Sequence, residues 1–326
     1  MARAFLTRQL PDAAMDIARR AGDITWSSDD RPLPQDELIA GARDAEGLLT
    51  LLTETVDAAV LDACPRLRVV ANCAVGYNNI DVAACTERGV LVTNTPGVLT
   101  ETTADFAWAL LLATARRVVE ADAYLRAGKF KSWGLMLLTG SDVYGKTLGI
   151  VGFGRIGQAV ARRAAGFGME ILYNGRSDSP EAAQLGAVRV ELAELLRRSD
   201  YVTLHVPYSA ETHHLIGRAE FAQMKPGAYI INTARGAVID EAALVDALAS
   251  GHLAGAGLDV YEREPAVTPA LLTMPNVVLA PHIASASVAT RTRMAVMAAT
   301  NLVAALSGQR PPNLINPEAL SANHRR

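Results

Sequence analysis

A glycine-rich turn in the middle of the chain lies between an apolar run and a helical run. Residues 152–157 read Gly-Phe-Gly-Arg-Ile-Gly, directly after the apolar run 147–151 and before the helical run 158–163. The first two glycines let the backbone turn tightly and approach a pyrophosphate, and the third lets helix and strand pack closely. The helix N-terminus then faces the anion. We therefore predict a dinucleotide site made by Gly152, Phe153, Gly154, Arg155, Ile156 and Gly157.

Short apolar runs alternate with helical segments along the chain, as expected for parallel α/β sheets. They form two sets: four predicted strands at 3–6, 47–52, 67–71 and 90–93, and six at 147–151, 170–173, 201–205, 228–232, 254–260 and 277–280. The second set suits a doubly wound sheet. We predict an α/β protein with two Rossmann-like or flavodoxin-like parallel-sheet domains and a cleft between them.

Two helical segments indicate how the domains share the chain. Residues 102–127 are predicted to be helical, and 104–115 carry only one charge, which is typical of a buried helix. Ser287 can cap a last helix that ends before Gly308, and this helix can return the chain to the first domain. We expect residues 1–98 and 285–326 to form a discontinuous substrate domain, and residues 99–284 to form the dinucleotide-binding domain.

Charge and composition exclude several classes of protein. Lys and Arg number 31 against 34 Asp and Glu, a net charge of -3, which does not suit a protein that mainly grips nucleic acid or anionic lipid. No secretory leader and no membrane-spanning run is visible, so we expect a cytoplasmic protein. Cys64, Cys73 and Cys85 match neither a zinc pattern nor a disulfide framework. We expect buried thiols and no metal.

The residues after the second strand of the inner domain bear on the choice of cofactor. An NAD site usually has an acidic residue there to bind the ribose diol, but this strand ends in Asn174-Gly175-Arg176-Ser177. A guanidinium and a hydroxyl suit a 2'-phosphate. Arg176 could also be an ordinary solvated arginine. We predict NADP as the preferred cofactor, with NADH possible.

Three polar residues follow later strands of the same predicted sheet, where ligands of open α/β sheets bind. They are Arg235, Glu264 and His282. A cation, a carboxylate and an imidazole are what reduction of a 2-oxo acid requires. Each also has an ordinary interpretation: a surface ion pair, a charged turn and a packed histidine, respectively.

Longer motifs resemble one family. They are Val-Gly-Tyr-Asn-Asn-Ile-Asp at 75–81, Val-Thr-Asn-Thr-Pro-Gly at 92–97, Asp-Val-Tyr-Gly-Lys-Thr-Leu-Gly-Ile-Val-Gly at 142–152, His-Val-Pro at 205–207, Asn-Thr-Ala-Arg-Gly at 232–236 and Pro-His-Ile at 281–283. Together they resemble the D-isomer-specific 2-hydroxyacid dehydrogenases, in particular the glyoxylate/hydroxypyruvate reductases. The family usually has Asp at Asn78 and Gly at Ala284.

The resemblance implies roles for the candidate residues. Arg235 would bind the substrate carboxylate, helped by the N–H groups of Val75 and Gly76. His282 would give its proton to the substrate oxygen, and Glu264 would orient His282 and favour its charged form. Leu52, together with its neighbours, would shape the substrate pocket. The cofactor would touch Thr103, Asn174, Arg176, Ser177, Val206, Pro207, Thr212, Thr233, Ala234, Arg235, Asp259, His282 and Ala284.

Some alternatives stay open on the sequence alone. The family includes nucleotide-sensing corepressors, and phosphite, formate and phosphoglycerate dehydrogenases share the superfamily. Trp133, Met136 and Leu137 form an apolar patch for which core packing is the default interpretation, although the family uses this region at its dimer interface. We expect a homodimer. The sequence does not decide which small 2-oxo acid is reduced.

Overall fold

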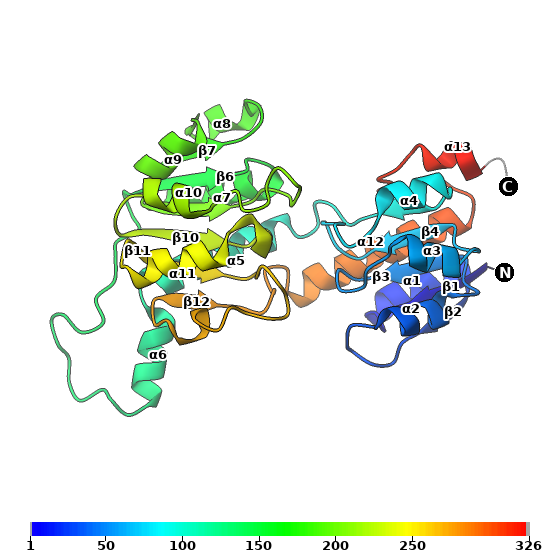
Figure 1. Ribbon diagram of the computed structural model, residues 1–326, viewed down its shortest axis with the longest axis horizontal. Coiled ribbons are helices and arrows are strands. Elements are labelled where there is room, and N and C mark those ends of the chain that lie inside the picture. Colours follow the sequence, from blue (N-terminus) through cyan, green and yellow to red (C-terminus); the bar gives the residue numbers. More distant parts are fainter. Residues whose placement is uncertain (1, 324–326) are drawn as a thin grey trace. The chain divides into compact units, whose positions relative to one another are not determined.

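The computed structural model describes residues 2–323, which divide into two compact units. Unit 1 contains the chain up to Leu99 and again from Ser287, and unit 2 contains Thr100–Ala286. Each unit is built on its own parallel β-sheet with helices on both faces (Figure 1). The prediction of two parallel-sheet α/β domains is confirmed.

The sheet of unit 1 has the order β2-β1-β3-β4-β5, with every neighbouring pair parallel. Its strands are β1 (Ala2–Leu6), β2 (Gly22–Trp26), β3 (Gly47–Thr50), β4 (Val69–Asn72) and β5 (Leu91–Thr93). Strand β2 was not predicted from the sequence. It lies at the edge of the sheet and is largely exposed, so it lacks the apolar run of a buried strand.

Helices sandwich this sheet because successive strand side chains point to opposite faces. Ala4 and Leu6 pack with α1 (Asp12–Ala18) and α12 (Val288–Leu306), whereas Phe5 packs with α2 (Gln35–Ala42) and α3 (Ala58–Ala63). Helix α4 (Val82–Glu87) lies with the second group. The predicted cap is confirmed, because the Ser287 hydroxyl accepts from the Thr290 N–H at 3.1 Å.

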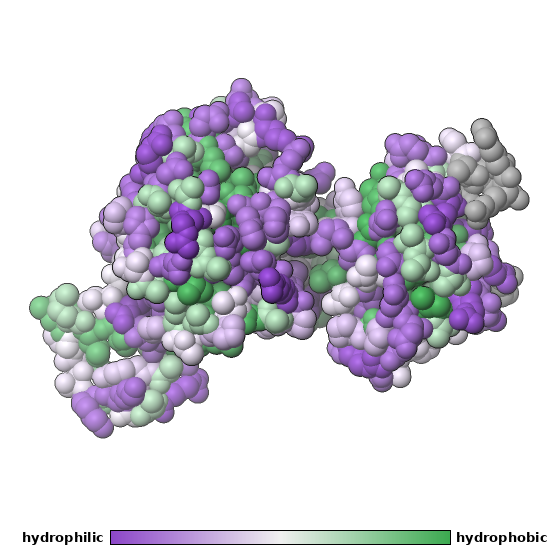
Figure 2. Space-filling view, in the orientation of Figure 1, coloured by the Kyte–Doolittle hydropathy of each residue, from purple (hydrophilic) through white to green (hydrophobic). Residues whose placement is uncertain are grey.

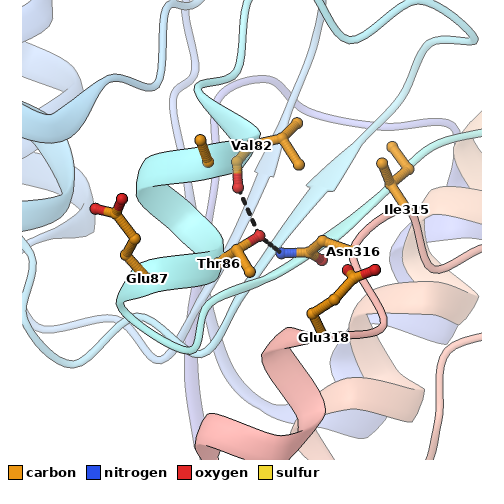
Figure 3. A pocket seen from close by; sticks show the side chains of 7 residues that line it. Val82, Thr86, Glu87, Ile315, Asn316 and Glu318 are labelled. Carbon is orange, nitrogen blue, oxygen red and sulfur yellow. Dashed lines mark hydrogen bonds between the residues drawn. The ribbon is translucent and has the colours of Figure 1, made fainter.

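The chain returns along unit 1 after α12, and its described part ends with α13 (Ala319–Asn323). Asn316 fastens this segment: its amide donates to the Thr86 hydroxyl and the Val90 carbonyl at 2.9 Å, and its oxygen accepts from the Val92 N–H at 2.7 Å. The open hollow beside it, about 500 Å³, is lined by α4 and this segment (Figure 3). The hollow lies within unit 1, where the segment after α12 packs against α4. None of its lining residues is a candidate site residue.

The sheet of unit 2 has the order β12-β11-β10-β9-β6-β7-β8, again with every neighbouring pair parallel. Its strands are β6 (Thr147–Val151), β7 (Glu170–Asn174), β8 (Ala187–Arg189), β9 (Tyr201–Leu204), β10 (Ala228–Asn232), β11 (Leu253–Leu258) and β12 (Val277–Leu279). The order reverses between β6 and β9, and such a switch point creates a ligand site at the carboxyl edge.

Both faces of this sheet are covered. Helices α5 (Thr100–Ala115) and α7 (Arg155–Ala164) pack on one face, and α9 (Leu192–Arg198), α10 (Arg218–Gln223) and α11 (Glu241–Ala249) on the other. The short α8 (Pro180–Gln184) precedes β8. The six-strand prediction missed β8, an exposed edge strand.

The predicted helix 102–127 is in fact two helices. Helix α5 ends at Ala115, Arg117 takes a left-handed conformation with φ of 52°, and α6 spans Val118–Arg126. No glycine or proline marks this break in the sequence. The buried character expected of 104–115 is found, because α5 buries Ala104, Trp108 and Leu111.

An apolar arm extends from unit 2. It consists of α6 and residues 127–140, and its large apolar side chains are exposed: Val118, Val119, Leu125, Phe130, Trp133, Leu135, Met136 and Leu137. Figure 2 shows green apolar residues over the loop that follows α6. The default interpretation of Trp133, Met136 and Leu137 as core residues is therefore wrong, because Trp133 is 77% exposed.

Other sequence expectations concern thiols, metals and membranes. Cys64 and Cys85 are buried, Cys73 is half-buried, and all three are unbridged. Within residues 2–323, no three His, Cys, Asp or Glu side chains are gathered so that they could bind a metal ion. In the same range, no helix has the length and apolarity needed to cross a bilayer.

Candidate active site

The glycine-rich turn joins β6 to α7 at the switch point of the unit 2 sheet. Gly152 has a φ of 93°, and a Cβ there would lie 2.7 Å from the His205 carbonyl carbon. A Cβ at Gly157 would lie 2.2 Å from the Gly152 oxygen, so this glycine permits close helix–strand packing. A Cβ at Gly154 would meet nothing within 4 Å. The turn thus leaves open space before the positive end of α7, which fits a pyrophosphate.

The carboxyl end of β7 has no acid at the position that usually binds the ribose diol. Asn174 donates its amide to the Val190 carbonyl at 3.1 Å, and Arg176 and Ser177 are exposed. Arg189 on β8 was missed by the sequence analysis because β8 itself was missed. It donates to the Gly175 carbonyl at 3.2 Å and pairs with Asp178 at 3.3 Å.

Arg235 stands on a turn that Asn232 holds at the end of β10. The Asn232 amide donates to the Arg235 carbonyl at 2.9 Å, and its oxygen accepts from the Ala234 N–H at 3.0 Å. Burial lowers the pKa of the Arg235 guanidinium, and the charge of Glu264 opposes this change. An arginine stays protonated in a protein, so the site contains a half-buried cation. Asn232 opens the motif at 232–236, but its residue type alone indicated no role for it.

The loops after β10 and β11 meet backbone to backbone. A Cβ at Gly236 would lie 1.8 Å from the Tyr261 carbonyl carbon, so only glycine fits there. The Tyr261 hydroxyl donates to the Ala280 carbonyl at 2.9 Å and thereby ties the β11 loop to the end of β12. The segments that carry Arg235, Glu264 and His282 are therefore joined at one edge of the sheet.

Glu264 and His282 form a hydrogen-bonded pair. Nδ1 of His282 lies 2.9 Å from Oε2 of Glu264, and Oε1 of Glu264 accepts from the Tyr261 N–H at 3.0 Å. Burial works to raise the pKa of the Glu264 carboxyl. Hydrogen bonds from His282 and Tyr261 and the charges of His282 and Arg235 outweigh burial, so the pKa lies below its ordinary value. Glu264 is therefore a carboxylate at neutral pH.

Asp259 fixes the backbone around His282. Its buried carboxylate accepts from the N–H groups of Ile283 and Ala284, each at 2.7 Å, and its carbonyl accepts from the His282 N–H at 2.9 Å. His282 has a φ of 53°, a conformation that non-glycine residues adopt at a cost. Burial raises the pKa of Asp259, and the two N–H groups offset this in part.

The remaining cofactor candidates also lie in unit 2. Thr103 is buried on α5, and Val206 and Pro207 follow β9. The Thr212 hydroxyl accepts from the Ser209 N–H and donates to the Pro207 carbonyl, both at 2.8 Å, which folds this loop on itself. The Thr233 hydroxyl is buried and has no hydrogen-bond partner within residues 2–323.

His205 is a second histidine at this edge of the sheet. Burial lowers its pKa to about 3, so it is neutral at physiological pH. Its Nε2 lies 2.9 Å from the Thr203 hydroxyl. His205 therefore carries no proton to give as an imidazolium at this pH.

The substrate candidates Val75, Gly76 and Leu52 lie in unit 1. Val75 and Gly76 are in the loop after β4, and Leu52 is in the loop after β3. Glu54 anchors that second loop, because its buried carboxylate accepts from the Leu51 N–H at 3.2 Å and the Thr53 hydroxyl at 2.8 Å.

Comparisons with known proteins identify the family to which the chain belongs. Residues 108–284 match the family described as "D-isomer specific 2-hydroxyacid dehydrogenase, NAD binding domain". The chain belongs to the D-isomer specific 2-hydroxyacid dehydrogenase family, and the resemblance inferred from its motifs is confirmed. Unit 2 contains the family's domain for a nicotinamide cofactor.

Individual relatives cover nearly the whole chain. A glyoxylate reductase from Korarchaeum cryptofilum is 53% identical over 98% of this chain and 97% of its own length. A solved protein from Thermus thermophilus is 47% identical with a TM-score of 0.90, covering 96% of this chain and 99% of its own. An NADPH-dependent glyoxylate/hydroxypyruvate reductase from Sinorhizobium meliloti, solved with NADP and malonate, is 36% identical with a TM-score of 0.87, covering 98% and 97%.

Proposed function

We propose that this protein is an NADPH-preferring reductase that converts glyoxylate, hydroxypyruvate or a similarly small 2-oxo acid to the D-2-hydroxy acid. The observation that carries the proposal is the hydrogen-bonded Glu264–His282 pair beside the half-buried Arg235, at the sheet edge that also presents the open Gly154 turn. The near-complete match to glyoxylate reductases supports this assignment over a corepressor-like binding protein or another dehydrogenase of the superfamily.

The two units have separate tasks in this proposal. Unit 2 binds the cofactor through the turn Gly152–Gly157, and unit 1 is the substrate domain. The N–H groups of Val75 and Gly76 and the guanidinium of Arg235 bind the substrate carboxylate, and Leu52 contacts the substrate side chain. Arg235 also polarises the ketone, as a fixed positive charge at the developing negative oxygen does.

The proton comes from His282. A bound reduced nicotinamide supplies the hydride that the substrate carbon receives. Because Nδ1 of His282 is engaged by Glu264, Nε2 is the nitrogen that gives its proton to the carbonyl oxygen. Glu264 remains ionised and stabilises the imidazolium, while Asp259 holds the backbone that aims the ring.

A kinetic matrix tests the proposed function. Consumption of NADPH and of NADH is followed with glyoxylate, hydroxypyruvate, pyruvate and 3-phosphohydroxypyruvate. With phosphite and formate, which would be oxidised, formation of NADPH from NADP+ and of NADH from NAD+ is followed instead. Turnover of glyoxylate or hydroxypyruvate with the highest kcat/KM supports the proposal. Turnover of phosphite, formate or the phosphorylated acid alone contradicts it, and so does cofactor binding without turnover of any acid.

The preference for NADPH has a specific test at Arg176. A planar guanidinium and the Ser177 hydroxyl suit a 2'-phosphate, and Asn174 offers no carboxylate to a bare ribose diol. Charged hydrogen bonds are worth about 1.5 to 3 kcal/mol, so we expect kcat/KM for NADPH to exceed that for NADH by roughly ten- to a hundredfold. Arg176→Ala removes most of this margin by weakening NADPH.

Two companion variants sharpen that test. Arg310→Ala removes an exposed arginine of unit 1 and leaves the ratio unchanged. Asn174→Asp, added to Arg176→Ala, turns the preference toward NADH because it restores a diol-binding carboxylate. If Arg176→Ala leaves the ratio of kcat/KM for NADPH to that for NADH unchanged, the assignment of this loop is wrong. Arg189, which contacts the same loop, is then the next candidate for binding the 2'-phosphate.

The apolar arm is proposed as the contact of a homodimer. Its exposed Trp133, Leu135 and Met136 form more apolar surface than a monomer usually shows to water. We expect light scattering to give twice the chain mass, and the double variant Trp133→Glu with Met136→Glu to give the single chain mass. Leu272→Glu, at another exposed apolar residue of unit 2, stays dimeric. A monomeric wild type contradicts the proposal.

A further inference from the structure

Three consecutive carbonyls in the loop after β4 all accept hydrogen bonds. The pairs are the Ala74 carbonyl with the Thr95 N–H at 2.9 Å, the Val75 carbonyl with the Asn94 amide at 2.8 Å and the Gly76 carbonyl with the Asn72 amide at 2.8 Å. Asn72 ends β4, and Asn94 follows the end of β5, which is the neighbouring strand. Donors from two adjacent strand ends therefore hold one side of this loop.

Because the peptide group is planar, these contacts of the carbonyls also fix the direction of the N–H groups. In a trans peptide, the C=O of one residue and the N–H of the next point in opposite directions. Asn94 thus aims the Gly76 N–H away from itself, and the Thr95 N–H does the same for the Val75 N–H. Within residues 2–323, the N–H groups of Val75 and Gly76 donate no hydrogen bond to the protein. Two aligned donors are left for a ligand.

The backbone of Asn94 is itself held by hydrogen bonds to other segments of unit 1. Its carbonyl accepts from the Asn301 amide of α12 at 3.1 Å, and its N–H donates to the Asn313 carbonyl at 3.3 Å. The Asn301 oxygen in turn accepts from the Asn313 N–H at 3.2 Å, and Asn301 is fully buried. The backbone of Asn94 therefore has little freedom, and its side chain is aimed at Val75.

Asn72 is an unfavourable choice if only stability matters. It is fully buried, and its side-chain oxygen has no hydrogen-bond partner within the described chain. A buried acceptor without a partner costs about 1 to 3 kcal/mol. What the Asn72 side chain provides against this cost is the amide N–H that donates to the Gly76 carbonyl.

We propose that Asn94 and Asn72 are positioning residues for the substrate carboxylate: by holding the carbonyls of Val75 and Gly76 they keep the loop's N–H groups aligned as a carboxylate cradle. The inference rests on the proposed function, in which the Val75 and Gly76 N–H groups bind that carboxylate. Asn94 acts directly on the peptide that carries the Gly76 N–H. Asn72 acts on the following peptide and fixes the far end of the cradle.

Asn94→Ala is the first test. The carboxylate is bound in the ground state and the transition state alike, so losing its alignment raises KM and leaves kcat nearly unchanged. We expect KM for glyoxylate and the Kd of oxalate, measured by calorimetry with NADPH present, to rise about ten- to a hundredfold, the worth of one charged hydrogen bond. The Kd of NADPH alone stays unchanged.

Asn94→Asp adds a readout that a purely structural role does not move. An ionised carboxylate cannot donate to the Val75 carbonyl and repels the substrate, whereas a protonated carboxyl donates again. The ratio of the variant's oxalate Kd to that of the wild type therefore falls as the pH is lowered from neutral toward about 5, as the introduced carboxyl begins to gain its proton.

Asn316→Ala is the matched control, because Asn316 is also a buried amide of unit 1 that bonds to backbone groups. It lowers Tm and leaves KM and the oxalate Kd unchanged. The proposal is overturned if Asn94→Ala changes the oxalate Kd no more than Asn316→Ala does, or if the ratio for Asn94→Asp is independent of pH. A wild type that reduces no 2-oxo acid refutes the proposed function instead, and oxalate binding then still tests the cradle.

Discussion

Replacing His282 with alanine lowers kcat for glyoxylate by about two to four orders of magnitude, the usual worth of a positioned general acid. The reason is geometric. Nδ1 of His282 is engaged by Glu264 at 2.9 Å, so in the proposed mechanism Nε2 is the donor. His205, at the same sheet edge, is neutral because burial lowers its pKa to about 3. Stopped-flow measurement of NADPH oxidation gives the rate. The Kd of NADPH stays within about threefold of the wild type, as the loss lies in the chemical step.

Glu264→Gln is the companion variant, and its effect is on pH dependence. In the proposed mechanism the Glu264 carboxylate lies beside the positive charge of a proton-donating ring, and the neutral amide of glutamine removes that attraction. We therefore expect the alkaline limb of the kcat/KM profile to move to lower pH. Near-wild-type turnover of His282→Ala at neutral pH contradicts the assignment of the proton donor. If the alkaline limb of Glu264→Gln does not move, the electrostatic role of Glu264 is refuted and only a role in packing is left for this residue.

Arg235→Ala lowers kcat/KM for glyoxylate by about thirty- to several-thousandfold, the range for removing one partner of a buried charge contact. Both parameters change, because in the proposed mechanism this guanidinium binds the carboxylate in the ground state and also polarises the ketone in the transition state. Arg235→Lys recovers only part of the loss, since an ammonium lacks the planar fork that matches a carboxylate.

Arg263→Ala serves as the control for Arg235, because Arg263 is an exposed arginine on the neighbouring loop. It keeps wild-type kcat and KM. A rise in KM with no fall in kcat for Arg235→Ala removes the polarising role and leaves carboxylate binding only. Unchanged kinetics refute both roles.

The sequence predicted the central strands and the edge strands β5 and β12, and it missed the edge strands β2 and β8. Strands such as β6 and β9 are buried on both faces and read as apolar runs, whereas β2 and β8 are edge strands with exposed residues and little apolar character. The break at Arg117 carries no glycine or proline, so local chemistry gives no sign of it. Trp133 was assigned to the core because aromatic residues are usually buried within a single chain, but its surroundings here are solvent.

The charged candidates were easier to find than the residues that position them. Arg235, Glu264 and His282 stand directly after strands and in motifs, so their type and place both pointed to them. Asn72, Asn94 and Asn232 act through hydrogen bonds to backbone carbonyls, and those bonds depend on the exact course of three loops. No periodicity or composition reports that course.

The close contact between Gly236 and Tyr261 couples the thermal motion of the two loops that carry Arg235 and Glu264. With the Gly236 backbone pressed against that of Tyr261, the turn that presents Arg235 and the loop that presents Glu264 cannot loosen one at a time. Opening of either loop therefore requires the other to move as well. The Tyr261 hydroxyl, which donates to the Ala280 carbonyl, couples this movement to the end of β12. Heat should therefore abolish the chemistry in a single cooperative event, coincident with melting of unit 2, rather than through an earlier softening of the site.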